Sequence, residues 1–189
     1  MFASEKILNK MKFFIYLVGF FVLLNGITAD KVADSVIQDS CKKITSLYDF
    51  CVASIKENPE SQKVKNIDDL IIVALKNAMS NMTHVKGIVD KILKDRKYKS
   101  KAIIKPLRNC IKYYSEGTDL LAKVLENAKL RNYNKVLGSI TDAVDVPLHC
   151  EYGFEGKNEL KSPVKKENRV LTYLTGICES IIYSTARRN

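Results

Sequence analysis

Residues 71–92 read IIVALKNAMSNMTHVKGIVDKI. Apolar side chains return in this stretch at alternating steps of four and three residues, at Ile71, Leu75, Ala78, Met82, Val85, Val89 and Ile92. Because an α-helix turns once in about 3.6 residues, these side chains share one helical face. Asn66 stands where a residue that caps the helix N-terminus is expected. The stretch therefore predicts a long helix that lays one apolar stripe into a bundle.

Three later segments show related patterns. One keeps the same steps with a polar interruption at Thr118, through Leu107, Ile111, Tyr114, Thr118, Leu121, Leu125 and Ala128. Another begins near Tyr133, is expected to be closed by Pro147, and carries Val136, Ile140, Ala143 and Val144. The last carries Leu171, Leu174, Cys178 and Ile181. Residues 66–189 are therefore predicted to form an all-α, antiparallel four-helix bundle.

The segment before the bundle is predicted to be a helical hairpin over residues 30–58. Apolar positions occur on both sides of the Cys41–Cys51 interval, and Asn58-Pro59 breaks the chain afterwards. The short interval suits two cysteines that face each other across a small hairpin. Cys110 and Cys150 fall near the ends of two later helical segments and could join them. Sequence alone leaves the pairing of the five cysteines open.

Residues 1–29 are typical of a secretory signal peptide. Apolar residues run from Phe13 to Leu24 after a basic start, and Ala29 is a small residue suited to cleavage. The run is shorter than the about 20 residues that a membrane span needs, so we expect no membrane anchor. Translation from Met1 or from Met11 would serve equally well. The mature chain, residues 30–189, is then expected to form one domain in an oxidising compartment.

The chain is basic. Its formal charge is +10, and removing three lysines and one glutamate with residues 1–29 leaves +8. In a secreted protein this charge serves solubility or attraction to an acidic surface, such as an anionic cell-wall polysaccharide or an acidic partner. We expect no nucleic-acid partner, because Tyr114 falls in the predicted core and the lysines of residues 94–101 lie in a connection between helices.

Little in the sequence points to catalysis. His84 and His149 are the two histidines, and both are expected to be structural or exposed helix residues. The chain lacks the spacings typical of zinc sites, nucleophilic serine or phosphate-binding loops. Cys178 lies on an apolar stripe, where a cysteine behaves as a small hydrophobic residue. We therefore predict no catalytic residue, no metal and no cofactor.

Four motifs together resemble one family. They are Tyr48-Asp49-Phe50-Cys51, the helix pattern Leu107-x2-Cys110-x3-Tyr114-x6-Leu121, Cys150-Glu151-Tyr152-Gly153-Phe154, and Ser162-Pro163-Val164 leading into Glu167-Asn168. Their order and spacing resemble the plant invertase and pectin methylesterase inhibitors, most of all invertase inhibitors that include pollen-allergen members. The resemblance covers residues 30–189. It implies the disulfides Cys41–Cys51 and Cys110–Cys150, with Cys178 free.

The resemblance also implies a function. The chain would be a secreted inhibitor that binds and blocks a plant carbohydrate-active enzyme, first invertase (beta-fructofuranosidase) and alternatively pectin methylesterase. Some invertase inhibitors insert a Pro-Lys-Phe loop into the enzyme, and Tyr133-Asn134-Lys135 stands at that place here, without the motif. These three residues are the predicted target-binding residues. Gly117 also departs from the family, which usually has alanine there.

Two other functions are compatible with the sequence. A secreted helical binder of lipids, or a non-inhibitory module that recognises a receptor, would show much of the same pattern. The expected location is the extracellular space and cell wall (apoplast), with the vacuole as the alternative. Asn81-Met82-Thr83 is an N-glycosylation sequon, and Asn81 is the predicted glycosylation site.

Overall fold

The computed structural model describes residues 31–155 and 160–188. The predicted signal peptide lies outside the described residues. The described chain is helical and contains no strand. Residues 31–41 are helical, and the later elements are η1 (Thr45–Leu47), α2 (Tyr48–Lys56), η2 (Pro59–Lys63), α3 (Ile67–Lys94), η3 (Lys101–Ile103), α4 (Ile104–Lys129), η4 (Tyr133–Val136), α5 (Leu137–Tyr152) and α6 (Lys165–Ala186).

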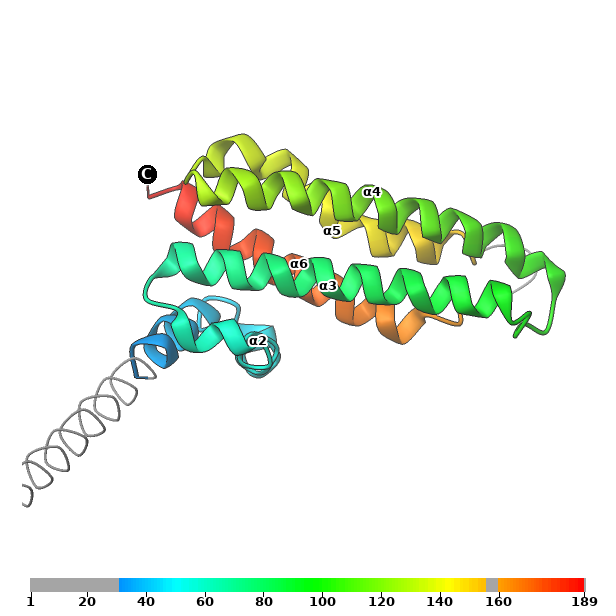
Figure 1. Ribbon diagram of the computed structural model, residues 1–189, viewed down its shortest axis with the longest axis horizontal. Helices are drawn as coiled ribbons and strands as arrows, with labels where there is room; N and C mark the ends of the chain where they lie inside the picture. The colour runs from blue at the N-terminus through cyan, green and yellow to red at the C-terminus, as the bar shows by residue number, and fades with distance from the viewer. Residues whose placement is uncertain (1–30, 156–159, 189) are drawn as a thin grey trace, which may run out of the picture.

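Helices α3, α4, α5 and α6 form an antiparallel four-helix bundle, as predicted (Figure 1). Each of them packs against two neighbours, because α3 contacts α4 and α6 while α5 contacts the same two helices from the other side. The N-terminal hairpin lies at one end of the bundle, and its α2 contacts α3 and α6. No helix in the described ranges is long and apolar enough to cross a membrane.

The caps of α3 explain where this helix begins. The Asn66 side chain accepts a hydrogen bond from the Asp69 backbone N–H at 3.0 Å, and the Asp69 carboxylate accepts one from the Lys65 N–H at 2.9 Å. These two bonds satisfy backbone donors that have no partner within the helix. Asp68 and Asp69 in the first turn and Lys91 and Lys94 in the last also suit the helix dipole.

The apolar stripe of α3 forms the centre of the core. Of the seven predicted positions, six are buried and Ile92 is partly buried against them. The stripe of α4 differs from the prediction by part of a turn. Its buried positions are Leu107, Cys110, Tyr114, Gly117, Leu121, Val124 and Ala128. Thr118 lies on the flank, where its hydroxyl donates to the Tyr114 carbonyl at 2.8 Å, so the core passes through Gly117 instead.

Pro147 does not close its helix, and this prediction was wrong. Helix α5 continues through the buried Pro147 to Tyr152. Proline cannot donate to the carbonyl one turn earlier. However, the next turn of α5 is held against α4 by the Cys110–Cys150 disulfide, whose Cα atoms are 4.7 Å apart. Tertiary packing and a covalent bond thus outweigh the local preference.

Both predicted disulfides are present, and Cys178 is free and buried. Cys41–Cys51 closes the hairpin, while Cys110–Cys150 joins α4 to α5. Every buried side-chain nitrogen or oxygen in the described parts of the chain has a hydrogen-bond partner. The bundle is therefore a scaffold with a packed core, in which the buried polar side chains are hydrogen-bonded within the protein.

Candidate target-binding site

The segment η4, which holds the predicted target-binding residues, follows a tight helix end. After α4, Arg131 adopts a left-handed backbone conformation with φ of 57°. The Arg131 N–H donates to the Ala128 carbonyl, and the Asn132 N–H donates to the Asn127 carbonyl, each at 2.9 Å. This pair of bonds is the Schellman ending of a helix. It turns the chain back over the end of the bundle where α3 begins.

A small polar cluster then attaches η4 to α3. The Tyr133 hydroxyl donates to the Asp68 carboxylate, and the Arg131 Nε lies 3.0 Å from the other Asp68 oxygen. The Tyr133 side chain is only 2% exposed. Burial and the hydrogen bond to Asp68 both raise the pKa of Tyr133, so its phenol stays neutral and remains a donor. The segment is thus pre-organised in the free protein.

The three predicted contact residues therefore divide into two kinds. Tyr133 is a packing residue in the free protein, and its ring is not on the surface. Asn134 and Lys135 are exposed, and no ion pair of Lys135 occurs in the described parts of the chain. Their role in target binding stays a prediction.

Sequence reasoning missed other residues of this surface. Leu130 is 70% exposed beside η4, and Arg131 is exposed as well. Asp68 lies in the first turn of α3, where an acidic residue suits the helix dipole without any further role. Its pairing with Tyr133, 65 residues later, has no local signal in the sequence.

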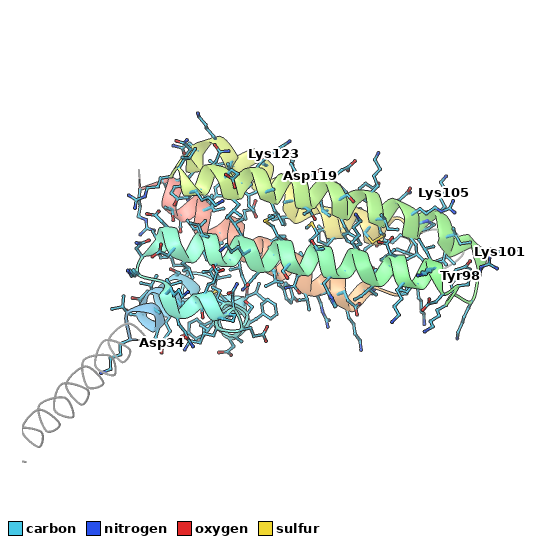
Figure 2. All side chains as sticks on the ribbon, in the orientation of Figure 1. Asp34, Tyr98, Lys101, Lys105, Asp119 and Lys123 are labelled. Atoms are coloured by element: carbon cyan, nitrogen blue, oxygen red, sulfur yellow. A yellow bond between two sulfur atoms is a disulfide. The ribbon has the colours of Figure 1, made fainter. Side chains whose placement is uncertain are left out.

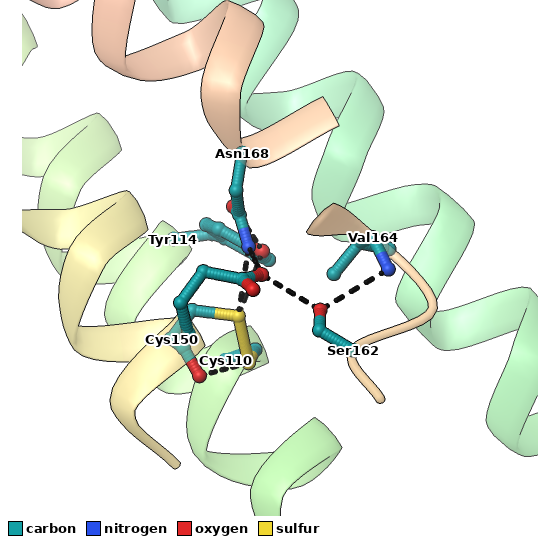
Figure 3. The surroundings of a disulfide bond; sticks show 7 residues. Cys110, Tyr114, Cys150, Ser162, Val164 and Asn168 are labelled. Carbon is teal, nitrogen blue, oxygen red and sulfur yellow. Dashed lines mark hydrogen bonds between the residues drawn. A yellow bond between two sulfur atoms is a disulfide. The ribbon is translucent and has the colours of Figure 1, made fainter. Parts of the chain in front are cut away.

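Residues from three of the four motifs that carry the family resemblance meet at a second location, around the Cys110–Cys150 disulfide (Figure 3). Asn168 is 2% exposed and lies at the centre. Its side-chain oxygen accepts from the Tyr114 hydroxyl at 2.8 Å, and its amide donates to the Glu151 carboxylate. Ser162 donates to the same carboxylate oxygen at 2.7 Å.

This network joins α4, α5, α6 and the segment that precedes α6. Burial raises the pKa of Tyr114, which keeps its hydroxyl neutral and able to donate to Asn168. Each member has a partner, so the cluster acts as a buried structural joint. It explains why three of the motifs, which are far apart in sequence, occur together, since their residues build one contact.

The histidines lie outside both clusters. His84 is exposed on α3, and His149 is exposed on α5, with its ring centroid 5.6 Å from that of Tyr113 and 6.5 Å from that of Tyr152. Among residues 31–155 and 160–188, no three His, Cys, Asp or Glu side chains are grouped so that they could hold a metal ion.

Comparison with known proteins agrees with this structure. Residues 35–181 match the family described as plant invertase/pectin methylesterase inhibitor. "Pectinesterase inhibitor 12" of Arabidopsis thaliana is 36% identical over 85% of this chain and 92% of its own length. A Platanus acerifolia protein named "Putative invertase inhibitor" is 28% identical over 87% and 92%.

A solved structure agrees as well. The crystal structure of a pectin methylesterase inhibitor from Arabidopsis thaliana superposes with a TM-score of 0.56 at 17% identity, and the match covers 79% of this chain and 95% of the other. At this identity the likeness shows the fold. The family match and the 36% identical relative show more: this chain belongs to the plant invertase/pectin methylesterase inhibitor family.

Proposed function

We propose that this protein is a secreted inhibitor without catalytic activity of its own, which binds and blocks a plant carbohydrate-active enzyme. The observation that carries the proposal is the match of residues 35–181 to a family of enzyme inhibitors. The first candidate target is invertase (beta-fructofuranosidase). The proposed location is the apoplast, with the vacuole as the alternative, and it rests on the predicted signal peptide of residues 1–29.

The scaffold suits inhibition by contact. Two disulfides and a filled core leave little freedom to lose when a partner binds, and this lowers the entropic cost of association. Both candidate enzymes are expected, from the resemblance, to place carboxylates in an open cleft. A basic protein is electrostatically complementary to such a cleft, which favours encounter and orientation. Lys135 is the exposed cation of η4, the segment that stands at the place of the missing motif.

Pectin methylesterase is the second candidate, and three observations favour it. The Pro-Lys-Phe motif is absent, and the buried Tyr133 leaves η4 without an exposed aromatic ring to insert into a cleft. In addition, the Arabidopsis relative that is 36% identical is named as a pectinesterase inhibitor.

An inhibition assay separates the candidates. The purified chain of residues 30–189 is titrated against a plant invertase and against a plant pectin methylesterase, with substrate turnover as the measurement. Inhibition of invertase supports the first candidate. Inhibition of pectin methylesterase alone supports the second, and no binding to either enzyme would contradict an inhibitory function.

One variant tests η4 as the contact. Lys135→Ala should weaken invertase inhibition by about 2 to 5 kcal/mol, because the lysine would be desolvated against carboxylates at the interface. Lys123→Ala is the matched control, since Lys123 is exposed on α4 and should change inhibition by less than about 1 kcal/mol. Equal inhibition by both variants would exclude η4 as the contact and would direct attention to the faces of the bundle.

A further inference from the structure

Positive charge is concentrated at one end of the bundle. The described residues contain 27 lysines and arginines and 18 aspartates and glutamates, a formal charge of +9. Residues 90–108, which we name the basic tip, contain two acidic residues and eight cations, a formal charge of +6. The cations are all exposed: Lys91, Lys94, Arg96, Lys97, Lys99, Lys101, Lys105 and Arg108. Two thirds of the excess charge thus occupies nineteen residues.

The tip has an ordered backbone. Arg96 adopts a left-handed conformation with φ of 53°, and the Lys97 N–H donates to the Ile92 carbonyl at 3.1 Å. This is the same Schellman ending that closes α4. Figure 2 shows Tyr98, Lys101 and Lys105 at the end of the bundle away from the hairpin. The tip therefore presents its cations from a defined turn.

Favourable interactions with the helix dipole explain only some of the cations in the basic tip. Lys91 and Lys94 lie in the last turn of α3, where cations suit the helix dipole. By contrast, Lys105 lies in the first turn of α4, which contains no acidic residue. Cations at a helix N-terminus are unfavourable. Within the described residues, the tip contains one ion pair, Lys97–Asp95 at 3.6 Å, so most of the cations repel one another without compensation.

The tip also lacks the features of a protein interface. Specific interfaces usually have an apolar centre with aromatic or aliphatic anchors. None of the large exposed apolar side chains of the described chain belongs to residues 90–108; they are Val32, Leu130, Leu148, Tyr152 and Val170. A dense set of flexible cations without an apolar anchor suits a linear polyanion, which repeats its charges along the chain and releases counterions on binding.

We propose that the basic tip binds an anionic polysaccharide whose uronate carboxylates recur along the chain. The tip and η4 lie at opposite ends of the bundle, because α3 begins beside η4 and ends at the tip (Figure 1). The polysaccharide surface is therefore separate from the candidate target-binding site. The protein can be held on a polyuronate while the other end remains free.

Polygalacturonate is the probe, and its fully methyl-esterified form is the neutral control. The chain of residues 30–189 should bind the first and not the second, with affinity that falls as salt rises. The test variant is Lys99→Glu/Lys101→Glu/Lys105→Glu. The matched control is Lys43→Glu/Lys63→Glu/Lys123→Glu, which changes the net charge equally at exposed sites outside the tip. The tip variant should lose at least about tenfold in affinity, and the control less than about threefold.

Three results would overturn the proposal. The first is no binding of the unchanged chain to polygalacturonate. The second is an equal loss in both variants, which would indicate attraction by net charge alone. The third is a tip variant that still binds polygalacturonate but no longer binds the target enzyme in a direct binding assay without polysaccharide, which would assign the tip to the enzyme. A failure of the proposed enzyme inhibition alone would leave the polygalacturonate result intact.

Discussion

Two arginines in left-handed backbone conformations end the two longest helices. Arg96 follows α3 and Arg131 follows α4, with φ values of 53° and 57°. Glycine is the usual residue at this position because a Cβ atom makes the conformation unfavourable. Arg131 gains a compensating ion pair with Asp68. For Arg96, no ion pair occurs in the described parts of the chain, so its strain is not offset in this way.

Arg96→Gly should therefore raise the free energy of unfolding by about 0.5 to 1 kcal/mol, because the strain is relieved. Urea unfolding followed by circular dichroism measures the change. Arg131→Gly is the comparison. It relieves the same backbone strain, but it also removes the ion pair with Asp68. It should stabilise less than Arg96→Gly or not at all. A destabilised Arg96→Gly variant would contradict the strain argument.

For single residues, the sequence identifies candidate functional residues better than it identifies the residues that they contact. Tyr133 was predicted as a target contact because an aromatic residue stands near the place of the family's inserting loop. Its burial depends on Asp68, which is far away in sequence and close only after α3 and η4 have packed. Asn66 was predicted correctly as a cap, because its partner is three residues away.

Gly117 determines how closely α4 approaches α3. A Cβ atom added there would lie 2.5 Å from the Met82 Sδ and 3.0 Å from a methyl group of Val146. Met82 is fully buried, so its thioether has little room to move. The glycine that the sequence presents as a weakness of α4 is thus the place where Met82 packs. A binary pattern of apolar and polar residues does not reveal this, because glycine has no side chain to count.

Gly117→Ala should lower the free energy of unfolding by about 1 kcal/mol, because the overpacking cost of roughly 1–3 kcal/mol exceeds the gain in helix propensity. In a Met82→Ala background the space is free, and the same substitution should become clearly less harmful or stabilising. Chemical denaturation of the four proteins in this cycle gives the coupling. An identical effect of Gly117→Ala in both backgrounds would exclude Met82 as the reason for the glycine.

The ends of α5 show why some element boundaries cannot be predicted. Pro147 is a strong local stop signal, yet α5 continues to Tyr152. The reason is the disulfide between Cys150 and Cys110 of α4. Cys110 is far from Pro147 in sequence, so the residues around Pro147 do not reveal this contact. Helices α3 and α6 carry apolar residues at helical steps, and both were predicted correctly as members of the bundle.

The sequon lies on α3 at the groove between hairpin and bundle. Asn81 is partly buried, and its amide donates to the Asn77 carbonyl at 3.0 Å. It lines a groove of about 610 Å³ together with Phe50, Asn58, Asn77 and Val170. We propose that Asn81 carries an N-linked glycan, as the sequon suggests, and that the glycan lies along this groove.

The protein secreted from a plant cell should then lose mass when treated with an N-glycosidase. Asn81→Gln and Thr83→Ala should both abolish the mass difference, because the sequon needs both residues. Ser80→Ala is the control, since it changes the same helix outside the sequon and should leave the glycan in place. An unmodified Asn81 in the secreted protein would contradict the proposal.

The described parts of the chain form a bundle and an attached hairpin, and each has its own disulfide. Cys110–Cys150 closes a separation of 40 residues within the bundle, while Cys41–Cys51 closes one of 10 in the hairpin. By loop entropy the two bonds stabilise by about 4 and about 3 kcal/mol. Their positions matter more than this difference. Cys41–Cys51 lies in the hairpin, whose α2 contacts α3 and α6, whereas Cys110–Cys150 lies at the central joint of three helices.

Cys178 can report which of these parts opens. Its thiol is buried on α6, and burial raises its pKa to about 12, so the reactive thiolate is suppressed in the folded protein. A thiol reagent such as Ellman's reagent at pH 8 should modify Cys178 only when the bundle opens. Labelling of the unchanged protein should accordingly be slow and should speed up through the unfolding transition.

Replacing both Cys110 and Cys150 by alanine should accelerate labelling of Cys178 by about a thousandfold, because the loss of roughly 4 kcal/mol raises the population of open bundles. Replacing Cys41 and Cys51 by alanine should accelerate it far less, since the hairpin can detach while α3 to α6 stay packed. The two rates are measured side by side with intact protein as the reference. Equal acceleration by both replacements would mean that hairpin and bundle unfold as one unit, and that the hairpin disulfide supports the core directly.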